Sequence, residues 1–345
     1  MALTEIYIDP SIAANSGTGT IGDPFGDLEY AIVQSTFDTV NGTRLNIKAG
    51  TAEFLVTNLE TSLVDTSVSV AWVNSAIAPL VFQGYTAVAG DGGRCKIDAG
   101  SGQAWSSATR NSVMFYDCWI TTTSASAMFD VNDNWMFIRC KVGPCGGTGL
   151  LGDSRLYVDN CFFTGVVATC MNGSSGSIFI NNFVDRLCIG PSCNATSGAS
   201  HVIANNVIET QLGDTGLIQI TSTYVFNNSI CCLSGTGVGV AINCQAAAIG
   251  FIKNNVIEGF NGVGGRGIEL SVDNLRYARM LAGNSFYNCE TNIIGNNSSD
   301  VAQQLAGDNE TLSASPFTNP SLANYSPVDT GSVKQGHSPQ NFMDS

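Results

Sequence analysis

A short motif recurs along the middle of the chain, in which asparagine separates two apolar runs. Its clearest copy spans Ile178 to Val184, with Asn181 and Asn182 at the centre. Eight copies follow one another at steps of 20 to 29 residues. Aligned on the second asparagine or its substitute, they are marked by Cys118, Cys140, Asn160, Asn182, Asn206, Asn228, Asn255 and Asn284. The position three before each mark and the position two after it are large and apolar in every copy.

A repeat of this length predicts a solenoid or another array of stacked units. The unit is too short for two helices and a turn, and its valine, isoleucine and aromatic residues favour short strands. Asparagine suits the bend between two strands because it tolerates a left-handed backbone. A leucine-rich repeat has a similar length, but its leucine pattern does not recur here. We therefore predict an all-β fold, a single-stranded right-handed parallel β-helix of roughly ten coils.

Stacking the coils also stacks the asparagines, whose side-chain amides can hydrogen-bond to one another. The sequence thus predicts a structural ladder along the solenoid, made by Asn160, Asn182, Asn206, Asn228, Asn255 and Asn284.

Three regions are expected along the chain. Residues 1–50 hold a first strand and a helix from about residue 24 to 36, and this helix is expected to cap the open end of the solenoid. Residues 51–297 form the β-helix body, although 51–78 fit no repeat well. Residues 298–345 are turn-rich and form an irregular tail that runs along the rod or contacts a neighbour.

Charge and composition exclude several functions. Only 12% of the residues are charged and the net charge is −14, which argues against binding nucleic acid. No run of 18 apolar residues exists, so we expect no membrane insertion, and the first residues lack the pattern of a secretory signal. The 12 cysteines are expected to be free thiols, with Cys193 and the pair Cys231-Cys232 as the places for an exception.

Several stretches resemble a known family. The opening Ile6-Tyr7-Ile8-Asp9-Pro10, the Asn-Asn-x-Ile coils and the tail from Ser315 to Tyr325 are similar to right-handed parallel β-helix proteins of the pectate-lyase-like superfamily, of phage and bacterial type. This resemblance implies the fold and a homotrimer. Enzymes of the superfamily use calcium with a basic residue, or two or three aspartates. No motif of either kind stands out here, so no family site residue is carried over.

One acidic constellation merits a chemical hypothesis. The alignment predicts that Asp117, Arg139 and Asp159 share a position on three successive coils. Asp117 and Asp159 would then lie about 10 Å apart, near the wide limit for an inverting glycosidase. The alternative is an ion ladder in which Arg139 keeps both carboxylates charged, whereas a general acid needs a raised pKa.

Two further groups of residues each have a functional and a structural interpretation. Asp130, Asp133 and Asp153 could bind calcium from neighbouring loops, or simply form Asx turns; no other cofactor is expected. An aromatic platform for sugar rings could come from Trp105, Tyr116, Trp119, Trp135 and Tyr157. Among these, Trp135 fits the core better and Trp105 lies in a Gly/Ser-rich loop.

The leading hypothesis is a structural and binding protein displayed on a virus particle, such as a phage decoration, fibre or tail-associated protein. It would assemble in the host cytoplasm as a homotrimer, contact other virion proteins, and bind host surface polysaccharide. One alternative is a polysaccharide lyase or glycoside hydrolase of tailspike type. The other is a bacterial adhesin on the cell surface.

Overall fold

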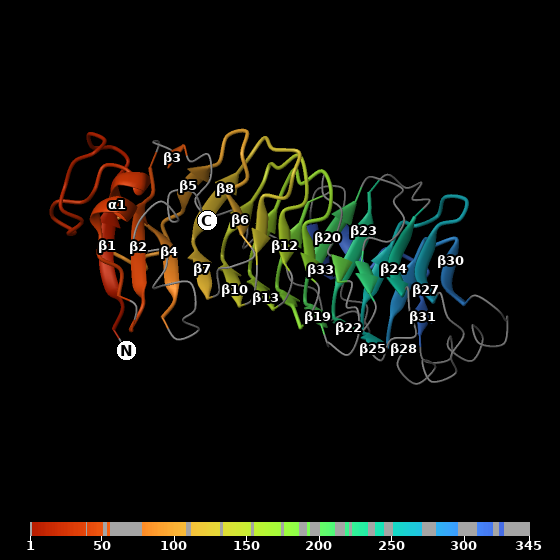
Figure 1. Ribbon diagram of the computed structural model, residues 1–345. Helices are drawn as coiled ribbons and strands as arrows, with labels where there is room; N and C mark the ends of the chain where they lie inside the picture. The colour runs from red at the N-terminus through yellow and green to blue at the C-terminus, as the bar shows by residue number, and fades with distance from the viewer. Residues whose placement is uncertain are drawn as a thin grey trace. The chain divides into compact units, whose positions relative to one another are not determined.

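The computed structural model is an all-β protein with almost no helix (Figure 1). It describes residues 2–38, 40–50, 54–55, 78–107, 112–131, 134–152, 155–173, 176–185, 192–193, 201–210, 218–220, 223–233, 239–244, 251–270, 281–295, 309–319 and 324–327. The chain divides into two compact units. Unit 1 holds residues 1–161 and 165–167, and unit 2 holds 162–164 and 168–345.

Unit 1 winds its strands into three parallel sheets. Sheet 1 has β1 (Thr4–Ile8), β2 (Thr43–Lys48), β4 (Leu80–Tyr85), β7 (Val113–Tyr116), β10 (Trp135–Ile138) and β13 (Leu156–Asp159) in that order. Sheet 2 has β3 (Phe54–Leu55), β5 (Cys95–Asp98), β8 (Cys118–Thr121) and β11 (Lys141–Val142). Sheet 3 has β6 (Trp105–Ser107), β9 (Phe129–Val131) and β12 (Leu150–Gly152).

Unit 2 repeats this plan. Its sheet 1 has β16 (Ile178–Ile180), β19 (His201–Ala204), β22 (Thr223–Phe226), β25 (Phe251–Lys253) and β28 (Leu281–Ala282). Its sheet 2 has β14 (Phe162–Phe163), β17 (Phe183–Val184), β20 (Val207–Thr210), β23 (Ser229–Cys232), β26 (Val256–Glu258), β29 (Ser285–Tyr287) and β31 (Glu310–Thr311). Its sheet 3 has β15 (Met171–Gly173), β18 (Ser192–Cys193), β21 (Ile218–Ile220), β24 (Val240–Cys244), β27 (Arg266–Leu270) and β30 (Thr291–Gly295).

The parallel solenoid is therefore confirmed, and two details of the prediction change. We expected one rod of roughly ten coils. Counted by the strands of sheet 1, unit 1 instead has about six turns, and unit 2 adds five strands to that sheet. The predicted helix exists as α1 (Leu28–Gln34), capped by Asp27, but it begins four residues later than expected and spans only seven. Leu28, Ala31 and Ile32 are buried, whereas a role as the cap of the solenoid is not shown.

A left-handed backbone makes the corner between sheet 1 and sheet 2 in successive coils. The residue at this corner has φ between 54° and 58° in seven coils, which are those of Asp117, Arg139, Asn160, Asn181, Asn205, Asn227 and Asn254. Gly283 takes the same place in a later coil, with φ 67°. Because side chains other than asparagine and glycine adopt this conformation at a cost, the asparagines of the motif are explained by the bend.

Side chains that alternate inward fill the core of each coil. In unit 1 the rings of Phe82, Phe115 and Phe137 stack on one another at centroid distances of 4.7 Å and 5.3 Å. Trp135 is fully buried beside them, as the sequence indicated. This stack occupies the same inward position in β4, β7 and β10, so the register of sheet 1 aligns the rings.

Candidate functional site

The asparagine ladder exists in unit 2. The Oδ1 atom of each asparagine accepts hydrogen bonds from the backbone N–H and the Nδ2 of the one before it, at 2.8–3.1 Å. Its members are Asn182, Asn206, Asn228, Asn255, Asn284 and Asn309. The first five are at most 1% exposed. Each amide therefore satisfies a buried backbone donor as well as its neighbour, which makes the ladder structural.

Asn160 is not part of this ladder, contrary to the prediction. β13 pairs with β10 so that Asp159 lies opposite Ile138, which places Asn160 beside Arg139 at the left-handed corner. The buried position of that coil belongs to Cys161. The alignment on Asn160 was shifted by one residue.

Unit 1 fills the ladder position with thiols. The sulfurs of Cys95 and Cys118 lie 3.5 Å apart, and Cys140 and Cys161 continue the row in the next two coils. All four are buried and free, which confirms the prediction for them. Burial is the largest cause that raises the pKa of Cys118 and Cys161 well above the ordinary value, so these thiols stay protonated and unreactive.

Asp117 and Arg139 form a bidentate ion pair at the corner of unit 1. Arg139 donates from Nε and NH2 to the two carboxylate oxygens of Asp117, both at 2.7 Å. The Asp117 side chain is 4% exposed and that of Arg139 is 44% exposed. The hydrogen bond to Asp117 is the largest cause that raises the pKa of Arg139. Arg139 is therefore held in its charged form.

The third member of the predicted constellation lies elsewhere. Asp159 aligns with Ile138 on the outer face of sheet 1, and its Oδ2 accepts a hydrogen bond of 3.2 Å from the hydroxyl of Tyr157. Its backbone carbonyl accepts a hydrogen bond of 3.0 Å from the N–H of Arg139. Asp117, Arg139 and Asp159 therefore do not share one position on three coils, and a carboxylate pair flanking a sugar is not formed by them.

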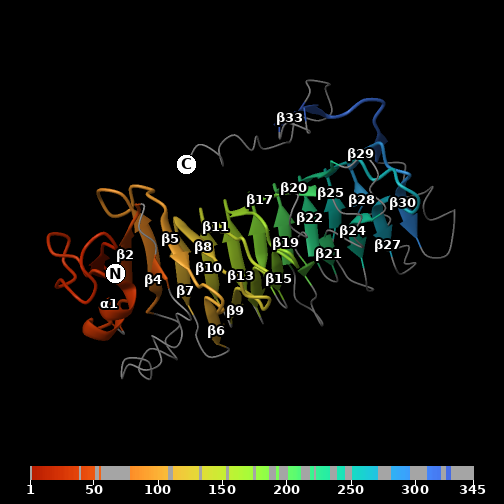
Figure 2. The same cartoon turned by 90° about the horizontal axis from the view of Figure 1, so that it is seen from above.

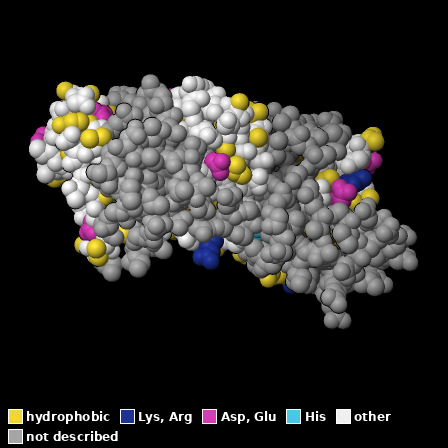
Figure 3. All heavy atoms as spheres, viewed as in Figure 1, with side chains coloured by type: hydrophobic (Ala, Val, Ile, Leu, Met, Phe, Trp, Pro, Cys, Tyr) yellow, Lys and Arg dark blue, Asp and Glu magenta, His cyan; other side chains and the backbone are white. Residues whose placement is uncertain are grey.

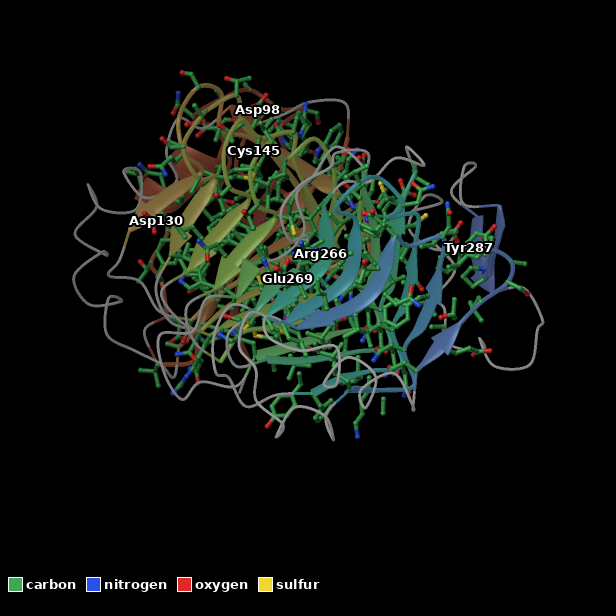
Figure 4. All side chains as sticks on the ribbon, turned by 90° about the vertical axis from the view of Figure 1, so that its right-hand side faces the viewer. Asp98, Asp130, Cys145, Arg266, Glu269 and Tyr287 are labelled. Carbon is green, nitrogen blue, oxygen red and sulfur yellow. The ribbon has the colours of Figure 1, made fainter. Side chains whose placement is uncertain are left out.

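The calcium candidates are not brought together. Asp130 is an exposed residue of β9 and lies on the outside of unit 1 (Figure 4). Asp133 and Asp153 fall outside the described residues. Within the described ranges, no three histidine, cysteine or acidic side chains are placed to hold a metal ion. On the face in Figure 3, the acidic side chains that are coloured lie apart from one another.

Among the predicted aromatic platform, Trp119 has the most distinctive surroundings. It points outward from β8, with Lys96 on β5 and Lys141 on β11 at the same position of the strands on either side. Their Nζ atoms lie 4.8 Å and 3.9 Å from the ring centroid. The indole Nε1 donates to the carbonyl of Gly143 at 2.8 Å, which fixes the ring. The side chain of Trp105 lies outside the described residues.

An outward row of side chains on sheet 2 of unit 2 was not predicted from the sequence. Glu209, Cys231, Glu258 and Tyr287 occupy the same position of β20, β23, β26 and β29. Glu209 is 5% exposed and Glu258 is 9% exposed, although side chains at this position point away from the core. The Glu258 Oε2 accepts a hydrogen bond of 2.8 Å from Ser315. Burial raises the pKa of Glu258, and this hydrogen bond opposes the shift.

His201 was also missed as a buried titratable group. It is 0% exposed in β19, and its Nδ1 accepts a hydrogen bond of 3.1 Å from the backbone N–H of Ser177. Its Nε2 is buried, and no described residue forms a hydrogen bond with it. Burial lowers the pKa of His201 to about 4, so the ring is neutral in the folded chain. The sequence does carry one signal for its burial. His201 lies two residues before Ile203, an apolar position of the repeat, and alternate residues of a strand face the same side.

No protein-family model and no curated protein matches the sequence. The solenoid that the resemblance implied is confirmed, whereas membership of the pectate-lyase-like superfamily stays a prediction. Among the described helices, none has the length and apolar character needed to cross a membrane.

Proposed function

We propose that this chain is a structural and binding β-helix protein displayed on the surface of a virus particle of phage type, as a decoration, fibre or tail-associated protein. The fold is consistent with structural or binding roles. The resemblance of the first strand, the coils and the tail to phage β-helix proteins supports the particle as its location. Assembly as a homotrimer in the host cytoplasm, in contact with other virion proteins, belongs to the same proposal.

The ion pair of Asp117 and Arg139 is the observation that carries a binding role rather than sugar cleavage. A catalytic carboxylate needs at least one oxygen that can reach the substrate. Arg139 instead donates hydrogen bonds to both carboxylate oxygens of Asp117, each at 2.7 Å. Asp159, the proposed second carboxylate, is engaged by Tyr157 on a different row.

We further propose that the row of Lys96, Trp119 and Lys141 contacts host surface glycans. It places an apolar ring beside two ammonium groups on one outer face of unit 1. Aromatic rings pack against sugar C–H groups, and ammonium groups donate hydrogen bonds to sugar oxygens. The fixed ring needs little ordering on binding because its Nε1 is already held by Gly143.

Electron microscopy of particles from the source, labelled with an antibody against this chain, tests the location. Label on particles is expected, and label confined to the bacterial envelope would favour the adhesin. Release of reducing sugar from host polysaccharide tests the chemistry. We expect none from the purified protein, and release that Asp117→Asn abolishes would replace binding by the tailspike-type enzyme. Sedimentation of the purified protein tests the trimer.

Glycan binding is tested separately by retention on immobilised host polysaccharide. Trp119→Ala should lose retention, and Lys141→Gln should weaken it. Tyr157→Phe, on sheet 1, serves as the control. Trp135→Phe would not serve, because the Trp135 ring is buried in the core. Equal retention of the Trp119→Ala chain and the parent would exclude this row as the contact.

A further inference from the structure

A segment of the tail crosses the outer face of sheet 2 in unit 2. β31 is the last strand of that sheet, and Leu312 continues it by donating its N–H to Phe286 at 2.7 Å. The chain then turns back over earlier strands. Figure 2 shows the blue segment that carries β33 (Asn324–Pro327) on the same side of unit 2 as β17, β20 and β29. We call Asn309 to Phe317 the strap.

Phe317 anchors the strap. Its side chain is 2% exposed and packs with Phe183, Val207, Cys231 and Val256, which come from four neighbouring strands. These four point outward from β17, β20, β23 and β26, since the positions between them face the core. These outward apolar side chains are buried because the strap covers them, and the phenylalanine ring removes a large apolar surface from water.

Glu258 lies at the second attachment of the strap. It is the next outward residue of β26 after Val256, and its only polar partner among the described residues is the hydroxyl of Ser315. Ser315 also receives the backbone N–H of Phe317 at 3.3 Å, so the same hydroxyl links the carboxyl to the anchor. The strap therefore covers a carboxyl group that would face water without it.

Among the described residues, no lysine or arginine lowers the pKa of Glu258. Cys231 on β23 and Tyr287 on β29 flank it in the sheet, and Glu209 lies one strand beyond Cys231. Cys289, after β29, is close enough for Glu258 to raise its pKa, although burial is the larger cause. Figure 4 places Tyr287 on the side of unit 2 that carries the tail strands. Loss of the proton from Glu258 thus leaves a charge among neutral or acidic groups, where desolvation is costly.

We propose that the strap is a pH-dependent closure, held on sheet 2 of unit 2 while Glu258 is protonated and released as Glu258 ionises. Burial under the strap raises the pKa of Glu258 above its ordinary value of 4.5, so the closed form binds the proton more tightly than the open form. The strap is fully held below the ordinary value and weakens as the pH rises toward the raised one. Over that window the ratio of open to closed strap increases by up to about tenfold per pH unit.

Limited proteolysis of the full chain tests this closure. A brief digestion with a protease of broad specificity is repeated between about pH 5 and about pH 8, and the rate is divided by that of an unfolded substrate at the same pH. Cleavage between residues 309 and 319, located by mass spectrometry, is expected to rise with pH in the parent chain. Glu258→Gln keeps the hydrogen bond to Ser315 without a charge, so its cleavage should stay slow across the range.

Glu310→Gln is the matched control, because Glu310 is an exposed carboxyl on β31 and its variant should follow the parent. Phe317→Ala should be cleaved more than roughly tenfold faster at about pH 5, since the anchor is lost. A parent rate that is flat with pH, or a Glu258→Gln rate that rises as the parent does, would overturn the proposal. If Glu258→Gln loses its β-sheet circular dichroism, Glu258→Met supplies the neutral variant for the same comparison.

Discussion

Replacing Asn206 by leucine tests whether the amide ladder stabilises unit 2. Asn206 is 1% exposed, and its side chain makes hydrogen bonds on both sides. Its Oδ1 accepts from the backbone N–H of Asn182 at 2.8 Å and from its Nδ2 at 3.1 Å. Its Nδ2 donates to the carbonyl of Phe179 and to the Oδ1 of Asn228. Leucine is similar in size but can replace none of these hydrogen bonds.

The expected loss follows from the groups that lose a hydrogen bond. The backbone N–H and the Nδ2 of Asn182 both lose the Oδ1 of Asn206, and each such loss at a buried group costs about 1–3 kcal/mol. The Oδ1 of Asn228 keeps the backbone N–H of Asn206, so it adds little. Asn206→Leu should therefore lower the free energy of unfolding by roughly 2–6 kcal/mol. Asn309→Leu should cost a similar amount, because Asn309 accepts the same two hydrogen bonds from Asn284, which is 0% exposed.

Urea unfolding followed by circular dichroism measures both variants. Stacked coils can lose cooperativity, so the midpoint and the slope are compared together before a free energy is assigned. A loss below about 0.5 kcal/mol for Asn206→Leu would show that the amide ladder is incidental to stability. A loss for Asn309→Leu far below that for Asn206→Leu would refute the argument that the two buried donors set the cost.

Three other predictions use the buried groups. Folding lowers the pKa of His201 from 6.5 to about 4. The free energy of unfolding should therefore be highest above pH 6.5 and fall by roughly 3 kcal/mol as the pH decreases to about 4. His201→Phe should remove this pH dependence in thermal melts at acid pH. Arg139→Asn should lower the free energy of unfolding by about 1.5–3 kcal/mol, because the buried carboxylate of Asp117 loses its ion pair. Adding Asp117→Asn to this variant should restore part of the stability, as thermal melts would measure. Iodoacetamide should label Cys118 and Cys161 only after unfolding, as mass spectrometry of the labelled chain would establish.

The sequence predicted the solenoid because its signal repeats. Asparagine at the corner and apolar residues on both sides recur in each coil, and the left-handed corner explains the first of these. Hydrophobic spacing then fixes which residues face the core. A pattern that each coil repeats can be recognised even where one copy is irregular, as at Asp117 and Arg139, which replace asparagine at the corner.

The register of a single coil was harder to predict. Taking Asn160 as the mark puts Tyr157 and Phe162 at the apolar positions, whereas taking Cys161 puts Val158 and Phe163 there. Both alternatives satisfy the pattern, and a shift of one residue exchanges the two faces of a strand. Pairing with β10 selects Cys161, and the same shift moves Asp159 away from Arg139. The candidate site failed for this reason rather than through its chemistry.

The strap could not be inferred from the repeat at all. A periodic pattern reports contacts between adjacent coils, whereas Ser315 and Glu258 are separated by 57 residues and meet on an outer face. The sequence shows Glu258 as an ordinary outward residue, which would be solvated on an open sheet. Only the packing of Phe317 on that face makes it buried.

The residue that follows the left-handed corner is a cysteine in coils of unit 1 and an asparagine in coils of unit 2, so the two units stack different side chains. Asparagine there is stable only if the coils on both sides supply matching groups, because each amide uses its neighbours to satisfy its own oxygen and nitrogen. A thiol makes weaker hydrogen bonds and leaves little unsatisfied when a partner is absent. Replacing one cysteine of the row should therefore cost little stability. Replacing one asparagine of the ladder breaks hydrogen bonds on both sides of it. This requirement explains why the asparagine ladder of unit 2 continues without a gap from Asn182 to Asn309. Substitutions are better tolerated at the outward positions of these coils, where Glu258 and the strap lie.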